Sequence, residues 1–366
     1  MTYNWQQSDW PHFKYDLKEI ENILFAFAER VGRVGGLLEG LPEDDRNEAM
    51  IDIMVAEAIK TSEIEGEYLS RQDVMSSIRN NLGLGHAPQP HDKRAQGIAE
   101  LMIDVRNSYA GKLTKAKLLS WHVMVMKGTR RVKGGQWRTH KEPMQVISGP
   151  IGKEKIHFTA PPSKIVPKEM TAFVKWFNDS APGGKNEIRK AIVRSAIAHL
   201  YFETIHPFED GNGRAGRALS EKALSQGMGR PVLMSLSKTI EANKKNYYDA
   251  LKEGQRSNEI TPWITYFANM VLASQIQAEE EIDFTLRKTR FFDKFQNTLN
   301  ERQVKVIKRM LEEGPKGFTG GMSAKKYMAI THTSKPTATR DLQDLVEKGI
   351  FTTSGGGRST RYEMNL

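Results

Sequence analysis

Apolar residues recur at intervals of three and four along several stretches of this chain, and this spacing predicts helices that bury one face or more. One stretch ends near residue 66, and another ends just before His206. The pattern gives helices at 17–33, 47–66, 187–205 and from 215 onward. We therefore expect a mainly α-helical protein.

Two short apolar runs interrupt this helical pattern. Residues 144–148 and 155–159 flank a turn at 149–152 that is rich in glycine and proline. Short apolar runs around such a turn are typical of a β-hairpin. The sequence therefore predicts one hairpin within a mostly helical core.

The segment 297–366 has its own pattern of elements. Apolar spacing predicts helices at 301–313, 323–330 and 334–349, and two short strands follow around a glycine-rich turn. The segment holds twelve Lys or Arg and seven Asp or Glu residues, so it carries half of the chain's net charge of +10. Positive charge of this size favours nucleic acid only non-specifically and is equally typical of a solvated surface.

Composition narrows the class further. The chain has 366 residues, of which 27% are charged and 39% hydrophobic, as in an ordinary soluble protein of two or three domains. It has no cysteine, which excludes disulfides and thiolate metal sites and suits a reducing compartment. The first residues lack the pattern of a secretion signal, and no apolar run approaches membrane-spanning length. We expect a cytoplasmic protein without a membrane partner.

The richest chemistry lies at residues 206–217, which read His-Pro-Phe-Glu-Asp-Gly-Asn-Gly-Arg-Ala-Gly-Arg. Gly211 and Gly213 leave backbone N–H groups open to an anion, and the helix that follows adds its dipole. Arg214 and Arg217 are three residues apart and can bind further phosphate oxygens. This combination predicts a site for a nucleoside triphosphate.

Two side chains of the same run suit group transfer. Asp210 can hold a hard divalent cation that bridges phosphate oxygens. His206 has an imidazole that titrates near neutrality when unperturbed, so it can take a proton from a hydroxyl group. A lone histidine beside a proline would more simply be a core or helix-end residue, but that interpretation leaves the glycines, the arginines and the aspartate unexplained.

The run 206–217 resembles, without a departure, the signature of Fic-domain proteins, His-Pro-Phe-x-Asp/Glu-Gly-Asn-Gly-Arg-x-x-Arg. Most proteins with the full signature are adenylyltransferases, which move AMP from ATP to a protein hydroxyl. The resemblance implies that His206 is the general base, that Asp210 is the Mg²⁺ ligand and that Arg217 holds the γ-phosphate. It also implies an anion hole for the α- and β-phosphates, formed by Gly211, Asn212 and Gly213 and supported by Arg214.

A second motif lies upstream. Thr61 and Glu65 are four residues apart on one helix face, and Gly66 is suited to cap the end of that helix. The run resembles the Fic inhibitory motif, Ser/Thr-x-x-x-Glu-Gly/Asn, whose glutamate pairs with the second arginine of the signature. The resemblance implies that Glu65 pairs with Arg217 and keeps the γ-phosphate from binding productively.

Two other acids flank this motif. Glu63 and Glu67 lie close to Glu65 in the chain, but neither has the full spacing of the inhibitory motif. We therefore assign them no inhibitory role. Without the complete signature downstream, the whole run would be interpreted as an ordinary solvated helix end.

Two further elements resemble parts of the Fic core. The predicted hairpin resembles the flap, which pairs with the target segment by strand addition, and its second arm would border the nucleotide through His157, Phe158 and Thr159. The helix at 243–251 resembles the one whose tyrosine encloses the adenine, which implies this role for Tyr247 and a nearby contact from Gln255. From pattern alone, His157 is an exposed hairpin residue and Tyr247 a core aromatic.

The C-terminal segment resembles a winged helix-turn-helix domain, which is often found at this place in Fic proteins. DNA contacts would come from the recognition helix and the wing, at Lys335, Thr337, Thr339, Arg340, Arg358 and Arg361. Winged helices also bind proteins and mediate dimers. DNA, a partner protein and a homo-oligomer therefore all stay open as partners.

These patterns predict three parts. An N-terminal helical domain at 1–83 carries the inhibitory motif, a Fic-type helical bundle with a β-hairpin flap occupies 84–290, and a winged helix-turn-helix domain occupies 297–366. We expect a protein adenylyltransferase that uses ATP and Mg²⁺ to modify a serine, threonine or tyrosine hydroxyl of a target protein, including its own.

Three alternatives stay open at this stage. Doc-like relatives transfer a phosphoryl group and have lysine where this chain has Gly213, which favours nucleotidyl transfer here, although other relatives use other nucleotides. The chain could instead be a regulator that binds DNA or a protein and uses the nucleotide site as a switch. The same site could also remove AMP from a modified protein, with Glu65 positioning water.

Overall fold

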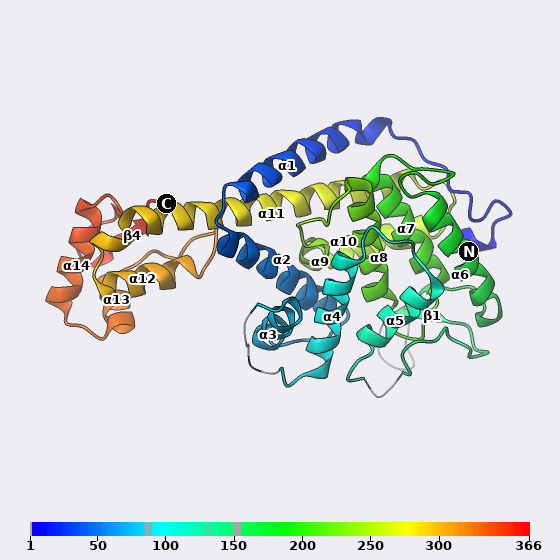
Figure 1. Cartoon of the computed structure of the whole chain (residues 1–366), viewed down its shortest axis with the longest axis horizontal. Helices are drawn as coiled ribbons and strands as arrows, with labels where there is room; N and C mark the ends of the chain where they lie inside the picture. Colours follow the sequence, from blue (N-terminus) through cyan, green and yellow to red (C-terminus); the bar gives the residue numbers. More distant parts are fainter. Residues whose placement is uncertain (1, 85–87, 89, 130–131, 149–154) are drawn as a thin grey trace. The chain divides into compact units, whose positions relative to one another are not determined.

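The computed structural model describes residues 2–84, 88, 90–129, 132–148 and 155–366, and these residues are mainly α-helical, as the sequence predicts (Figure 1). None of the described helices has the length and apolar character needed to cross a bilayer. The helices are α1 Glu21–Glu39, α2 Glu43–Ile64, α3 Arg71–Leu82, α4 Lys93–Asn107, α5 Lys115–Val125, α6 Val166–Asp179, α7 Ala191–Ile205, α8 Asn212–Met228, α9 Leu236–Ala242, α10 Lys244–Gly254, α11 Thr261–Phe295, α12 Glu301–Leu311, α13 Ala324–Thr331 and α14 Lys335–Glu347. The strands are β1 Gln145–Ser148, β2 Lys155–Thr159, β3 Phe351–Ser354 and β4 Arg361–Met364.

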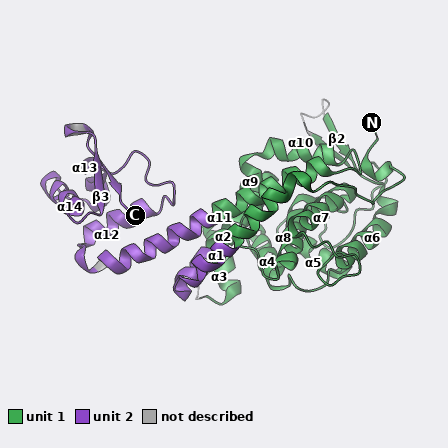
Figure 2. Cartoon of the chain, turned by 90° about the horizontal axis from the view of Figure 1, so that it is seen from above, with its two compact units in different colours: residues 1–31, 50–278 green, residues 32–49, 279–366 purple. Residues whose placement is uncertain are grey.

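The chain divides into two compact units (Figure 2). The first comprises residues 1–31 and 50–278, and the second comprises residues 32–49 and 279–366. Each unit therefore contains residues from the N-terminal region together with residues from later in the chain. The three-part division at 1–83, 84–290 and 297–366 stays a prediction.

Helix α7 is the centre of the first unit. It packs against α8 and α6, and every residue from 192 to 205 is buried (Figure 1). A helix that is buried on all sides belongs in a core rather than at a surface. Arg194 is buried there too, where it donates to the carbonyls of Phe177 and Ala223 at 2.8 and 3.0 Å.

The start of α7 differs from the sequence prediction. The helix begins at Ala191, not at residue 187. The amides of Asn186 and Ile188 donate to the carbonyls of Asp179 and Ser180 at the end of α6, at 2.8 and 3.0 Å. Their N–H groups therefore make hydrogen bonds to the end of α6, and the regular hydrogen bonds of α7 begin only after them.

The predicted hairpin is present on the first unit. Strands β1 and β2 are antiparallel, with Val146 opposite Phe158 and Ile147 opposite Ile156. The predicted turn at 149–152 lies outside the described residues. Two N-terminal aromatic residues hold the second strand in place. Trp5 donates its indole N–H to the carbonyl of Thr159 at 2.9 Å, and the ring of Tyr3 lies edge-on to Phe158 at 4.9 Å.

The second unit contains the predicted C-terminal elements. Helices α12 to α14 enclose a core with the strands β3 and β4, which pair antiparallel. Asp341 organises this core, since it accepts hydrogen bonds from Arg302 at 2.7 Å and from the Tyr327 hydroxyl at 2.9 Å. The side chain of Arg358, one of the predicted wing residues, lies outside the described part of the chain.

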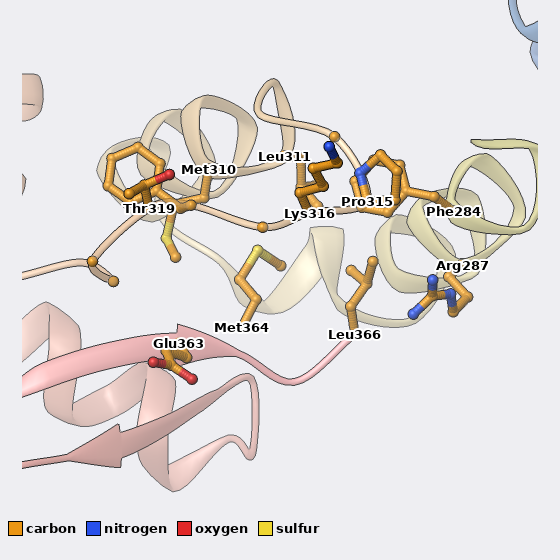
Figure 3. Close-up of a pocket in the computed structure, with 15 residues that line it drawn as sticks. Phe284, Arg287, Met310, Leu311, Pro315, Lys316, Thr319, Glu363, Met364 and Leu366 are labelled. Atoms are coloured by element: carbon orange, nitrogen blue, oxygen red, sulfur yellow. The ribbon is translucent and has the colours of Figure 1, made fainter. Parts of the chain in front are cut away.

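A pocket of about 430 Å³ also lies within the second unit (Figure 3). The end of α11, α12, the glycine-rich loop 314–321 and the last residues of the chain line it. Met364 and Leu366 lie on one side, and Leu311, Pro315 and Lys316 on the other (Figure 3). Its lining is therefore mixed, with apolar side chains beside the charged residues Arg287, Lys316 and Glu363.

Candidate nucleotide-transfer site

The loop between α7 and α8 places His206. This residue caps the C-terminal end of α7 in the left-handed conformation, with φ 49° and ψ 61°, and its amide donates to the carbonyl of Phe202 at 2.9 Å. Asn212 closes the loop, because its side chain exchanges two hydrogen bonds of 2.9 Å with the backbone of Phe208. The Phe208 ring is fully buried and stacks on His122 at 3.8 Å. The phenylalanine of the signature is thus a structural anchor for the histidine beside it.

The first turn of α8 offers the predicted anion site. Gly211 caps this helix with φ 82°, a left-handed conformation that glycine adopts without strain. The unpaired N–H groups of a helix N-terminus then face outward and favour negative charge. At Gly213, a Cβ would collide with Oε1 of Glu65. The carboxylate of Glu65 therefore lies directly against the backbone at which a phosphate would bind.

The predicted pairing of Glu65 with Arg217 is present in the geometry. The Glu65 carboxylate accepts a hydrogen bond from Arg217 at 2.7 Å, and Arg217 also donates to the hydroxyl and the carbonyl of Thr61 at 2.7 and 2.9 Å. The Arg217 side chain is only 2% exposed. Burial raises the pKa of the Glu65 carboxyl, but Arg217 and then Arg214 outweigh this and hold it below its usual value. Gly66 follows the end of α2 with φ 81°, so glycine suits the sharp turn there.

The other arginine of the signature is paired as well. Glu67, to which the sequence analysis assigned no role, accepts a hydrogen bond from Arg214 at 2.8 Å. Arg214 is 3% exposed, and a second carboxylate, that of Asp210, lies 3.7 Å from it. The turn after α2 therefore supplies an acid to each arginine. The sequence analysis missed Glu67 because the inhibitory motif ends at Gly66, one position before it.

A pocket of about 680 Å³ joins most of the predicted site residues. It is lined by Glu65, His157, Phe158, His206, Asp210, Gly211, Asn212, Gly213, Arg217, Tyr247 and Gln255. Four predicted site residues do not line this pocket: Arg214, Thr61, Gly66 and Thr159. Arg214 and Thr61 lie behind Glu67 and Glu65. Thr159 accepts a hydrogen bond from Trp5 through its carbonyl. The sequence analysis missed Glu203, Lys245, Tyr248 and Lys252, which also line it.

The two tyrosines of α10 differ in their surroundings. Tyr247 is 1% exposed, and its hydroxyl lies 2.6 Å from Nε2 of His199 in the core. Tyr248 is 37% exposed and lies edge-on to Tyr247 at 5.2 Å. Both rings border the pocket, but only Tyr248 offers an open aromatic surface. Pairs of adjacent aromatic residues in a helix give no sequence signal for which one faces a ligand.

His206 is set up to be a neutral base. Its side chain is 14% exposed, and Arg138 donates to its carbonyl oxygen at 2.7 Å. Burial, with Arg138 nearby, lowers the pKa of the imidazole to about 4. Near pH 7 the ring is therefore unprotonated and able to accept a proton.

Asp210 fits a divalent cation that is shared with a ligand. Its side chain is 51% exposed and lines the pocket, and one carboxylate oxygen accepts the Gly211 amide at 2.5 Å. In the described ranges, no cluster of three or more acidic or histidine side chains could hold a metal by itself. A carboxylate oxygen is a hard ligand that suits Mg²⁺, which is commonly bound by one or two carboxylates together with phosphate oxygens and water.

Two parts of the chain match known protein families. Residues 112–224 match the Fic/DOC family, and residues 3–84 match a domain of unknown function, DUF4172. Among curated relatives, a probable protein adenylyltransferase of Aquifex aeolicus is 35% identical over 99 residues, which cover 27% of either chain. The protein adenylyltransferase Fic of Culex quinquefasciatus is 25% identical over 212 residues, covering 56% of this chain and 38% of the relative. The chain thus spans well under half of these relatives.

Solved structures share the fold over a longer stretch. A Fic family protein from Desulfovibrio desulfuricans superposes with a TM-score of 0.55 and 21% identity, over 97% of this chain and 98% of that one. A Fic-domain signalling protein from Bacteroides thetaiotaomicron gives a TM-score of 0.52 at 16% identity, over 73% of this chain and 97% of that one. At this level of identity the likeness concerns the fold.

Proposed function

Because this chain carries a Fic/DOC-family domain at residues 112–224, we propose that it is a protein adenylyltransferase that moves AMP from Mg-ATP to a serine, threonine or tyrosine hydroxyl of a target protein. The observation that carries this proposal is the single pocket in which a neutral buried histidine, an exposed aspartate and a glycine-capped helix N-terminus meet. The relatives named as protein adenylyltransferases support the same reaction.

Each group has a defined task in this reaction. His206 takes the proton of the target hydroxyl, whose oxygen then forms a bond to the α-phosphorus while the bond to the pyrophosphate oxygen breaks. The N-terminus of α8, from Gly211 to Gly213, binds phosphate oxygens through backbone N–H groups. Bound at Asp210, Mg²⁺ would neutralise charge on the phosphates. Arg217 holds the γ-phosphate and so sets the orientation of the α-phosphorus.

We infer that Glu65 inhibits the transfer in the described conformation. Glu65 occupies the fork of Arg217 and also the surface of Gly213, so the γ-phosphate and the carboxylate compete for the same donors. Inhibition is therefore intramolecular, and displacement of the α2 end is needed for productive binding. A second contact, between Glu67 and Arg214 at 2.8 Å, supports the same state.

A transfer assay tests the proposal. Wild-type, Glu65→Gly and His206→Ala proteins are incubated with Mg²⁺ and ATP labelled at the α-phosphate, and the label retained on protein is measured. We expect more label in Glu65→Gly than in the wild type and none when His206→Ala is added to it. Absence of label in Glu65→Gly, with ATP binding intact, would refute adenylyl transfer and favour another nucleotide donor, the reverse reaction or a regulatory role.

The C-terminal elements support a second, separate proposal of a winged helix that contacts DNA. Lys335 and Arg340 of α14 are exposed, while Thr337 and Thr339 are half-buried. The double variant Lys335→Ala/Arg340→Ala should then weaken binding to duplex DNA and reduce its salt dependence, with transfer activity unchanged. Equal DNA binding by both proteins would leave protein docking or self-association as the role of this unit.

A further inference from the structure

Glu203 is a buried acid of the pocket that lies outside the signature. It lies one helical turn before His206 on α7, and its side chain is 6% exposed. Its Oε2 lies 3.7 Å from Nδ1 of His206. Within the described part of the chain, neither Nδ1 of His206 nor Oε1 of Glu203 has a hydrogen-bond partner. Buried polar atoms without partners are uncommon in folded proteins, so two of them side by side at a reacting group require an explanation.

The neighbouring helices leave space for this carboxylate. A Cβ at Gly216 of α8 would collide with Oε1 of Glu203. On the other side, Gln255 donates to the Glu203 carbonyl at 3.2 Å, which fixes the backbone. The side chain is therefore held by shape between α7 and α8, directed toward His206. The signature pattern allows any residue at the position of Gly216. In this chain glycine suits that position because a side chain there would collide with Glu203.

We propose that Glu203 is a positioning residue for His206, whose carboxylate accepts the Nδ1–H group so that the lone pair of Nε2 faces the target hydroxyl. A neutral imidazole carries its proton on only one nitrogen, and the partner of the other nitrogen decides which. The separation of 3.7 Å is longer than that of a hydrogen bond. Catalytic contacts of this kind are often long before substrate binds and shorten in the reacting complex.

Glu203 also balances the charge that forms during the step. The hydroxyl proton passes to Nε2 as the oxygen bonds to the α-phosphorus and pyrophosphate leaves, so His206 becomes an imidazolium. An ionised carboxylate beside Nδ1 stabilises this cation and itself takes up no proton. This inference rests on the proposed function, since it needs His206 to be the base.

The charges around Glu203 allow its role to be tested through the pH dependence of kcat. Burial raises the pKa of Glu203 to about 8. The positive charge of Arg217 opposes this shift, and the negative charge of Glu65 adds to it. The charged and titratable groups around Glu203 and His206 are Glu65, Arg138, His199, Asp210, Arg217, Tyr247 and Tyr248. Burial lowers the pKa of His206 to about 4 and raises that of Tyr248 above its usual value, so neither group titrates in the pH range of Glu203.

The test uses Glu203→Gln, which keeps the size and removes the charge, and Glu203→Met, which also removes the acceptor. Both are made in the full-length Glu65→Gly protein. We expect kcat to fall about 10- to 100-fold, because these variants lose part of the rate enhancement that a correctly oriented base provides. The KM for ATP should change little. In the parent, kcat rises with pH as Glu203 ionises, with a midpoint below 8 because Glu65 is gone, and this rise is absent in Glu203→Gln.

Glu221→Gln is the matched control. Glu221 is on α8 and, like Glu203, has a pKa raised to about 8 by burial, but it lines a separate small cavity with Glu57 and Arg106. We expect this variant to keep the kcat and pH profile of its parent. Thermal unfolding of all variants shows whether a loss of activity comes from loss of the fold.

A readout without turnover separates this inference from the proposed function. Nitrogen-15 NMR of the histidine rings, with His206→Ala used for assignment, reports the tautomer of His206. We expect the Nδ1-protonated form in the parent and a changed tautomer ratio in Glu203→Met. An unchanged tautomer would overturn the pairing whether or not the protein transfers AMP. Unchanged kcat in Glu203→Gln would overturn the charge-balancing role, while complete absence of transfer in the parent would refute the function instead.

Discussion

The Glu65 carboxylate and the Arg217 guanidinium lie 2.7 Å apart, although 152 positions separate them in the chain. The contact joins the end of α2 to the first turn of α8, and Thr61 holds the remaining face of the guanidinium. A buried arginine cannot be left without acceptors, so any release of Glu65 requires a replacement anion. The γ-phosphate of ATP has the right charge and the right geometry for this exchange.

The first prediction concerns release of this contact. Glu65→Gly should raise the rate of AMP transfer about 10- to 100-fold, because a charge-assisted hydrogen bond of about 1.5–3 kcal/mol no longer competes with the phosphate. Initial rates with labelled ATP measure the effect. Glu63→Gly is the control, since Glu63 pairs with Lys60 at 2.5 Å and does not contact Arg217. Equal activation by both variants would mean that disordering the helix end, rather than freeing Arg217, is responsible.

The second prediction concerns the other pair. Glu67→Gln leaves the contact between Glu65 and Arg217 intact, so it should activate less than Glu65→Gly. Added to Glu65→Gly, it should lower the KM for ATP further, because Arg214 is then free of its 2.8 Å partner. Titration of ATP in the single and double variants measures this. If the double variant matched Glu65→Gly in KM, Glu67 would have no share in inhibition.

The sequence analysis anticipated the first pair and not the second, which shows what spacing can and cannot predict. Glu65 was found because the run from Thr61 to Gly66 resembles the Fic inhibitory motif, whose glutamate follows the Ser or Thr by four residues. Glu67 reaches Arg214 from the turn after α2, where no helical spacing marks it. Glu203 does lie at a helical spacing of three from His206, but the space that Gly216 leaves for its carboxylate comes from the packing of α7 on α8, which the sequence pattern does not show. The start of α7 was misplaced for a related reason, since Asn186 and Ile188 bond to the preceding helix.

The third prediction concerns pH. The pKa of the Glu65 carboxyl is lower in the folded protein than its usual value of 4.5, because Arg217 and Arg214 outweigh the effect of burial. The stability that it contributes is therefore complete above about pH 4.5 and is lost as the pH falls through the lowered value. The Tm difference between the wild type and Glu65→Gln should shrink with acidification in that range. A constant difference would mean that the stabilisation does not depend on the charge of Glu65.

The fourth prediction separates the two tyrosines of α10. Tyr248→Ala should raise the KM for ATP about tenfold, since stacking of a base on an aromatic ring contributes roughly 1–3 kcal/mol. Tyr247→Phe should instead lower stability by about 1–3 kcal/mol, because His199 loses its hydroxyl partner in the core. Denaturant unfolding and ATP titration are measured on both variants. If Tyr247→Phe instead raised the KM for ATP and Tyr248→Ala left it unchanged, Tyr247, the residue chosen from the sequence, would be the one that contacts the base.

The central claim is that this site transfers AMP to protein under the control of Glu65, and intact-mass spectrometry of the Glu65→Gly protein after incubation with Mg-ATP tests it most directly. We predict a species heavier by one AMP group, which is scarce in the wild type and absent when His206→Ala is added. Heavier species that carry only a phosphate would contradict nucleotidyl transfer. Unmodified Glu65→Gly protein that still binds ATP, both alone and mixed with a cell extract as a source of targets, would contradict the proposed function as a whole.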